Sequence, residues 1–189
     1  MKIKKNITGT QFLALITLFM LSCNNDDDGY SNQPEPKSIQ LKVIGKGAAV
    51  AQFKTFTHPK TGEAIEADCY LMGLIDLDTG HIIGTLEDCV VDMEVPSDGT
   101  ITSRVITSIN INGRGTIQAE STVFQEMYDP INLDFNTSFT PTNNNVINTS
   151  LEFEGMEGTV SLEGEINYSD FGHGILVFNN NFSINLANN

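Results

Sequence analysis

Apolar and polar residues alternate along most of residues 38–189, which is the pattern of β-strands with one buried face. The alternation is most regular near the C-terminus, where Val160, Leu162, Ile166 and Tyr168 are separated mainly by polar residues. No segment after the leader keeps the 3.6-residue apolar period of an amphipathic helix. We therefore expect one all-β domain in this part of the chain.

Several segments carry this β-type pattern, and turns rich in glycine, asparagine and aspartate separate them. They span residues 39–44, 48–56, 69–77, 82–95, 101–111, 116–124, 131–139, 160–168 and 176–186. The segment at 131–139 lies in a polar region, so we expect an irregular strand there, followed by a loop. Short strands at fairly even spacing predict an antiparallel barrel or sandwich.

Two glycine-containing segments resemble the barrel family of allene oxide cyclases and dirigent proteins. They are Thr79-Gly-His-Ile-Ile-Gly-Thr-Leu-Glu-Asp-Cys89 and Gly113-Arg-Gly-Thr-Ile-Gln-Ala-Glu120. The resemblance covers about residues 40–125 and, in a looser form, the remainder to 186. It implies an antiparallel barrel of about eight strands with an apolar ligand cavity, in some members an oligomer. The acidic pocket residues of that family match no position here, so no functional residue is transferred.

Residues 1–22 have the features of a bacterial signal peptide. A basic start precedes an apolar run at 12–21, which is too short to span a bilayer core of about 30 Å as a helix. The run ends in Leu-Ser followed by Cys23, which resembles the lipobox of bacterial lipoproteins. The resemblance implies that Cys23 is diacylated on sulfur, becomes the N-terminus after cleavage and is acylated on nitrogen. An ordinary secretion signal is the alternative.

Residues 23–37 are polar and acidic and contain Pro34 and Pro36, a composition typical of a disordered linker. The acidic residues directly after Cys23 resemble the tag that exports some lipoproteins to the cell surface. A solvated tether, kept extended by like charges, is the other interpretation, and both can hold together. We expect a protein held by its acyl chains at the outer membrane or the cell surface, since several chains anchor stably.

The charge of the chain limits its partners. The whole sequence carries a formal charge of −14, and the leader holds three of the basic residues and none of the acidic ones, so the mature charge is 7 − 24 = −17. Nucleic acids and anionic lipid headgroups both require clustered lysine and arginine. We therefore expect no nucleic-acid partner. The sequence leaves the oligomeric state open.

Two cysteines, Cys69 and Cys89, remain for the mature domain, in a compartment that permits disulfides. The segment 78–80 (Asp-Thr-Gly) has the composition of a three-residue hairpin loop, in which Leu77 faces His81. The same pairing places Cys69 opposite Cys89, and directly opposed residues lie within disulfide range. We predict this disulfide; two free buried thiols, or a bulge that shifts the register, are the alternatives.

The sequence offers no catalytic or metal-binding motif. His58, His81 and His173 all read as loop residues, and their spacing does not suit a zinc site. No serine lies in a Gly-x-Ser-x-Gly elbow. Asp76 and Asp78 could offer oxygens to calcium, but the EF-hand pattern fails at its fifth and sixth positions, so solvated turn aspartates fit better. We expect no cofactor and no metal.

Candidate pocket residues come from the faces of the predicted strands. Glu87 shares a face with Cys89, and inside an apolar barrel it could donate or accept protons; a plain ion pair with an arginine is the alternative. Glycine among large residues leaves space in a barrel wall, so we predict a cavity beside Gly164, open at one end. Tyr168 and Phe178 lie on the faces that would line it.

Three functions remain at this stage. The first is a cell-envelope lipoprotein whose barrel binds a small apolar or carbohydrate-like ligand without catalysis. The second is a cyclase or isomerase, as the resemblance implies. The third is a structural or adhesion module that presents an acidic surface to a partner protein. A hollow barrel with buried carboxylates would favour the enzyme, and a filled one the structural module.

Overall fold

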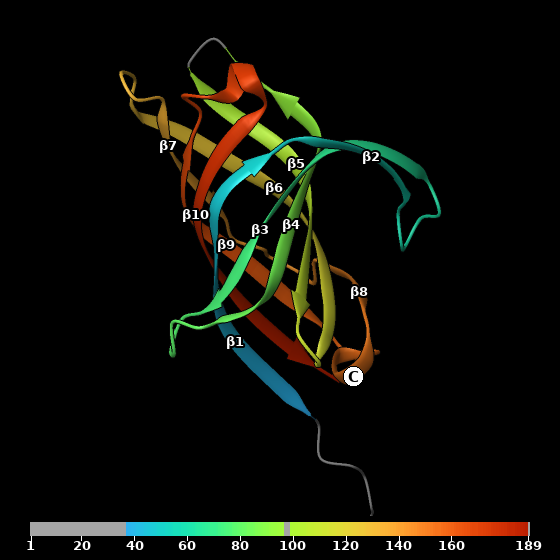
Figure 1. Ribbon diagram of the computed structural model, residues 1–189. Coiled ribbons are helices and arrows are strands. Elements are labelled where there is room, and N and C mark those ends of the chain that lie inside the picture. Colours follow the sequence, from blue (N-terminus) through green and yellow to red (C-terminus); the bar gives the residue numbers. More distant parts are fainter. Residues whose placement is uncertain (1–36, 97–98, 189) are drawn as a thin grey trace, which may run out of the picture. The chain divides into compact units, whose positions relative to one another are not determined.

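The computed structural model describes residues 37–96 and 99–188 (Figure 1). The predicted signal peptide, almost all of the predicted linker and Cys23 lie outside these residues. Within them the regular structure consists of β-strands and two single-turn 3-10 helices, and every strand pairing is antiparallel. The predicted all-β antiparallel fold is therefore confirmed. No helix in the described residues is long and apolar enough to cross a membrane.

The elements follow one another with short connections. In chain order they are β1 (Ser38–Val50), β2 (Gln52–Thr57), β3 (Ala64–Asp76), β4 (Ile82–Glu94), β5 (Thr100–Ile111), β6 (Gly115–Asp129), β7 (Asp134–Phe139), β8 (Val146–Thr149), η1 (Leu151–Phe153), β9 (Glu157–Asn167), η2 (Phe171–His173) and β10 (Ile175–Ala187).

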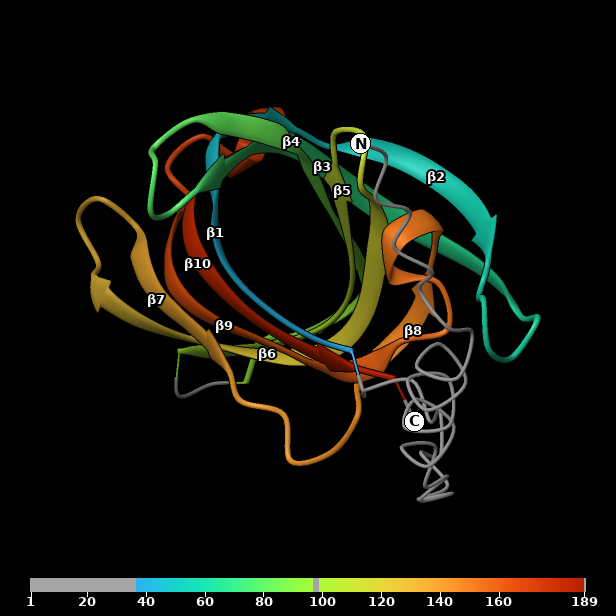
Figure 2. The same cartoon turned by 90° about the horizontal axis from the view of Figure 1, so that it is seen from below.

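Eight of these strands form a closed ring, in the order β1-β10-β9-β7-β6-β5-β4-β3. The ring closes where residues 43–46 of β1 pair with residues 73–76 of β3. Figure 2 looks along the barrel and shows the ring, with β2 and β8 lying outside it. β2 pairs with the first part of β3, and β8 pairs with β6. Closure removes the free edges that an open sheet would expose.

The main core fills the inside of the ring. Alternate residues of each ring strand point inward, as in β5, where Ile101, Val105, Ile109 and Ile111 are all buried as the sequence predicts. The inward faces of β9 and β10 are buried in the same core. Burial of apolar surface at about 25 cal/mol per Å² makes this core the main source of stability.

A second, smaller cluster lies on the outer face of β3, β4 and β5. It contains Ile65, Ala67, Cys69, Cys89 and Ile106. Part of β2 and β8 packs against it from outside. This cluster explains why two additional strands cover the outside of the ring here, because apolar residues on an outer wall need a partner surface.

The strands differ from the sequence prediction in several places, among them the start of β3, which lies at Ala64 rather than at residue 69. β1 continues to Val50, where the pattern predicted a break after residue 44. β8 falls in a region predicted to be a loop, because its sequence is short and half polar. In β4 a bulge at Val91 shifts the register, so Met93 packs against the inner core, although strict alternation would place it on the same outer face as Cys89.

Candidate functional site

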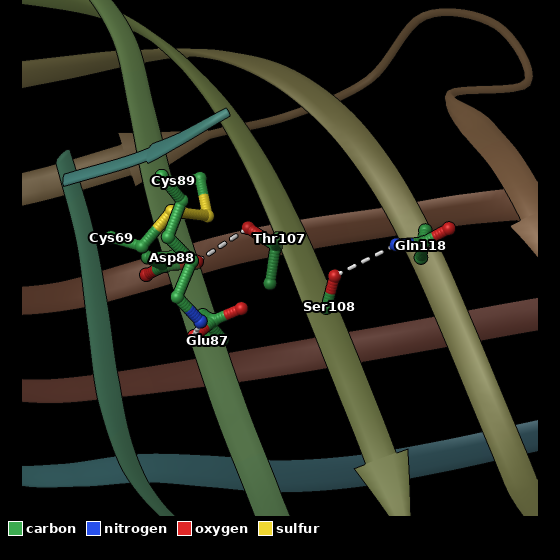
Figure 3. The surroundings of a disulfide bond; sticks show 8 residues. Cys69, Glu87, Asp88, Cys89, Thr107, Ser108 and Gln118 are labelled. Atoms are coloured by element: carbon green, nitrogen blue, oxygen red, sulfur yellow. Dashed lines mark hydrogen bonds and ion pairs between the residues drawn. A yellow bond between two sulfur atoms is a disulfide. The ribbon is translucent and has the colours of Figure 1, made fainter. Parts of the chain in front are cut away.

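Cys69 and Cys89 form a disulfide on the outer face of the barrel, as predicted. The two residues lie directly opposite one another in β3 and β4, with their Cα atoms 3.9 Å apart. Figure 3 shows the bond beside Glu87, which points to the same side of β4. The two sulfurs and the Glu87 carboxylate lie within 4.8 Å of one another. Sulfurs joined in a disulfide supply no thiolate, so this group does not suit a metal ion.

The prediction that Cys69 pairs with Cys89 assumes a three-residue hairpin loop at residues 78–80, and the loop in the structure is longer. The Asp76 N–H donates to the His81 carbonyl, so the loop holds four residues, 77–80, rather than three. Ile75 pairs with Ile82, and the next pair toward the disulfide joins residues 74 and 84. The bulge at residue 83 therefore offsets the one-residue register shift that the longer loop causes, and Cys69 pairs with Cys89 as predicted.

β2 and the first part of β3 (residues 52–67, the hairpin arm) lie across the outer face of the barrel. Between the arm and the barrel wall is an open cavity of about 380 Å³, which we call the outer cleft. The residues that line it come from β2, its following turn, and β4, β5 and β6. They are Lys54, Thr55, Phe56, Thr57, Pro59, Glu87, Cys89, Ile106, Ser108 and Gln118.

Polar side chains in the outer cleft form hydrogen bonds with one another. Lys54 Nζ donates to Glu87 Oε1 at 2.5 Å, joining the arm to β4. Gln118 Nε2 donates to Ser108 Oγ at 3.0 Å, as Figure 3 shows, while Asn148 Nδ2 donates to Gln118 Oε1 at 2.9 Å. The amide of Gln118 is thereby fixed in one orientation. The cleft combines these groups with an apolar floor formed by the second cluster.

The tip of the hairpin arm is fastened to the barrel by His58. The sequence suggested a plain loop histidine, but its side chain is buried and its Nε2 lies 3.2 Å from Glu120 Oε2. Its Nδ1 accepts the N–H groups of Lys60 and Thr61, which places the proton on Nε2. Glu120 also accepts a bond of 2.6 Å from Arg104 Nε. Partial burial raises the pKa of Glu120, but these hydrogen bonds outweigh it and lower the pKa overall.

Inside the barrel, Asp88 is a buried carboxyl group that is 6% exposed. It alternates with Glu87 along β4 and therefore points inward, where Thr107 Oγ1 donates to its Oδ1 at 2.6 Å (Figure 3). Burial raises the pKa of Asp88 to about 6, against a smaller lowering by the Thr107 hydroxyl. The sequence left two possibilities for Glu87, a carboxyl inside the barrel or a plain ion pair with an arginine. The structure corrects the first: Asp88 occupies the interior, and Glu87 lines the outer cleft.

Tyr168 and Phe178 both line the interior, as the sequence predicted. Tyr168 OH donates to Gln125 Oε1 at 2.6 Å, and its ring lies edge-on to Phe135 at 4.9 Å. Burial raises the pKa of Tyr168 to about 12, so this phenol acts as a hydrogen-bond donor. The ring of Phe178 lies 5.6 Å from that of Tyr70.

The interior is almost filled, with a free cavity of about 20 Å³. A Cβ atom placed on Gly164 would lie 2.6 Å from Asn180 Oδ1 and 2.4 Å from the Asn179 carbonyl oxygen. Gly164 thus permits a close approach of β9 and β10, and the cavity next to it is far smaller than the ligand cavity that the sequence predicts. A shallow hollow on the outer side of Gly164 is polar, with Glu163 and Glu165 on its wall.

The interior also contains a set of inward-pointing polar residues that the sequence patterns did not predict. Besides Asp88 they are Ser103, Thr107, Ser121, Gln125, Thr137 and Asn180. A signal was present, because each occupies an inward position on a strand whose neighbouring inward positions are mostly apolar, as Asn180 does between Phe178 and Phe182.

Comparison with known proteins adds no relative. A scan against protein-family models finds no match, and a search of curated proteins finds none that is significant. The resemblance to allene oxide cyclases and dirigent proteins therefore remains a prediction that rests on short motifs.

Proposed function

We propose that this protein is a lipid-anchored protein of the bacterial cell envelope that binds a small carbohydrate-like ligand in the outer cleft. The observation that carries the proposal is the contrast between two spaces. The outer cleft measures about 380 Å³, whereas the barrel interior leaves about 20 Å³. Small-molecule sites typically occupy about 300–1,000 Å³, so of these two spaces the outer cleft is the one with room for an organic ligand. The hollow on the outer side of Gly164 measures about 430 Å³, but it is shallower and its wall is more polar.

The lining of the outer cleft suits a sugar better than a purely apolar molecule. Sugars present hydroxyl groups at the rim of their rings and C–H groups on the faces. Lys54 and Glu87 supply a charged donor and acceptor, and Gln118 supplies an oriented amide. The side chain of Phe56 and the floor at Ile106 offer apolar surface to a ring face.

The envelope assignment rests on the sequence and on the disulfide. The leader and its lipobox-like end predict acylation of Cys23. The Cys69–Cys89 disulfide agrees with an oxidising compartment, because structural disulfides are rare in the bacterial cytosol. Periplasmic and external faces of the outer membrane are both compatible with this reasoning.

The cyclase or isomerase alternative would use the interior. Asp88 is the feature that favours it, since a buried carboxyl with a pKa of about 6 can exchange protons near neutral pH. However, a cavity of about 20 Å³ has no room for an organic substrate. We therefore assign no catalytic residue.

A ligand-binding experiment tests the proposal. The protein should give saturation-transfer NMR signals with at least one member of a panel of common hexoses, pentoses and N-acetylhexosamines. Lys54→Met and Glu87→Gln should each weaken that binding by at least about tenfold, because each removes a charged hydrogen-bonding group from the cleft. Lys42→Met and Glu165→Gln, both exposed and outside the cleft, serve as matched controls and should leave binding unchanged.

Two results would reject the proposal. One is the absence of any signal from the whole panel at millimolar concentrations. The other is binding that the control substitutions weaken as much as those in the cleft. With a properly folded protein, either result would favour the third function, a structural or adhesion module.

A further inference from the structure

A row of inward-pointing residues crosses four neighbouring strands of the barrel. Gln125 of β6 pairs with Thr137 of β7, Thr137 pairs with Gly164 of β9, and Gly164 pairs with Asn180 of β10. Gly164 has no side chain, so the side chains of Thr137 and Asn180 face one another across it. The carbonyl oxygen of the Asn180 amide lies directly over Gly164, 2.6 Å from where a Cβ atom would be.

Three buried side-chain atoms of this row have no hydrogen-bond partner within the described residues. They are Thr137 Oγ1 and both the Oδ1 and the Nδ2 of Asn180. Thr137 is 2% exposed and Asn180 1% exposed, so bulk water does not reach them. Buried polar groups are almost always hydrogen-bonded, and an unpaired one costs about 1–3 kcal/mol. Asn180 alone would leave two such atoms unpaired.

The small interior cavity lies at this same place. Its wall includes Thr137 and Asn180, with Gln125 and Asp88 as further polar residues. Its volume of about 20 Å³ exceeds the roughly 10–15 Å³ that a single water requires. We propose that Thr137 and Asn180 form a binding site for one internal water molecule, over the inner side of Gly164.

Water fits these groups better than other occupants of the same size. It can donate to Asn180 Oδ1 or accept from Nδ2, and it can bond to the Thr137 hydroxyl in either direction. A cation would interact favourably with the two oxygens, but it would be repelled by the partly positive hydrogens of Asn180 Nδ2. An apolar molecule would leave all three atoms unpaired. This site is separate from the outer cleft and does not depend on the proposed function.

Oxygen-17 magnetic relaxation dispersion, which detects water molecules held inside a protein for longer than nanoseconds, tests the site. The protein should show a long-lived internal water, and a Thr137→Val/Asn180→Leu variant should lose about one. Ser103→Ala is the matched control, because Ser103 Oγ is also buried and unpartnered but does not line the cavity. This control should keep the signal.

A second measurement uses the unaltered protein, so that the proposal can still be tested if the double variant does not fold. A high-resolution crystal structure of the unaltered protein should show density for one water within hydrogen-bond distance of Asn180 and Thr137. An empty site there would overturn the proposal. So would a metal ion at coordination distance, or a double variant that folds and retains the full relaxation signal.

Discussion

Among single residues, the buried carboxyl of Asp88 lowers the stability of the folded protein when it is ionised. Burial raises its pKa to about 6, whereas an unfolded aspartate titrates near 3.9. The folded state therefore binds this proton more tightly, so the contribution of Asp88 to stability is most favourable below the unfolded pKa and becomes less favourable as pH rises toward 6. Above that pH the cost is constant at about 3 kcal/mol.

Asp88→Asn should therefore stabilise the barrel at high pH. Asparagine keeps an oxygen for the Thr107 hydroxyl but carries no charge. We expect a gain of up to about 3 kcal/mol in the free energy of unfolding at pH 8 and almost none at about pH 3.5. Urea unfolding at both pH values measures the difference. A variant that is equally destabilised at the two pH values would show that Asp88 contributes packing rather than a charge cost.

Residue-scale features were only partly accessible from the sequence. Alternation along β4 correctly placed Glu87 and Asp88 on opposite faces, but it did not say which face is inside. The outer face of β3, β4 and β5 carries its own apolar cluster, so the hydrophobic pattern there has no single buried side. The prediction of a cavity beside Gly164 rests on its missing side chain alone, because the sequence does not show how closely β9 approaches β10.

At the scale of elements, Asn145 joins β6 to β9 where β7 no longer lies between them. Its Nδ2 donates to the carbonyls of Glu120 and Val160 and to Ser121 Oγ, and its Oδ1 accepts the Val160 N–H. Its backbone adds bonds with Glu120 and with Gly158. One residue thus replaces part of a strand ladder across this gap.

Asn145→Ala should destabilise the barrel by about 2–3 kcal/mol, because it leaves partly buried backbone groups of two strands without a partner. Thermal unfolding followed by circular dichroism gives the comparison. Asn143→Ala is the control, since Asn143 is exposed and bonds only weakly to Thr142 at 3.5 Å. Equal effects from the two substitutions would contradict a joining role for Asn145.

The disulfide should also stabilise the barrel measurably. It closes a loop with a sequence separation of 20, for which chain entropy predicts about 3 kcal/mol. A Cys69→Ala/Cys89→Ala variant should lose an amount of this order in urea unfolding while its circular dichroism spectrum stays that of a β protein. A loss below about 0.5 kcal/mol would mean that packing around the second cluster compensates for the missing crosslink.

Most strands could be predicted because half-buried strands alternate strictly. β8 could not, since it pairs on the outside with only a few residues of β6 and has no regular pattern. The bulge at Val91 was also invisible, because an added residue changes the register without changing composition. The disulfide was predicted correctly only because a longer loop and a bulge offset one another.

For the whole molecule, membrane attachment can be tested independently of the structure and ligand binding of the barrel. Under the proposed lipid anchoring, Cys23→Ala should move the protein from the membrane fraction to the soluble fraction, because it removes the residue that would carry the acyl chains. Cell fractionation followed by immunoblotting measures the change, with Cys69→Ala/Cys89→Ala as a control that should stay in the membrane fraction. Persistent membrane association of Cys23→Ala would contradict lipid anchoring at this cysteine.

The sequence alone could favour a closed barrel over a sandwich only through a resemblance of short motifs. It could not show that the interior is nearly filled, because side chains from all eight ring strands decide that together. Nor could it show the outer cleft, which exists because His58 holds the hairpin arm against β6. Both features depend on contacts between residues far apart in the sequence.

The location of a bound sugar on the protein decides whether the outer cleft is its binding site. Amide chemical shifts of the isotope-labelled protein can be followed while the sugar that gives the strongest saturation-transfer signal is added. We expect shifts concentrated at residues of the outer cleft, such as Lys54, Glu87 and Gln118, with little change at the inward-pointing Tyr168 and Asn180. Shifts concentrated at Tyr168 and Asn180 instead, or confined to the ends of the barrel, would contradict it.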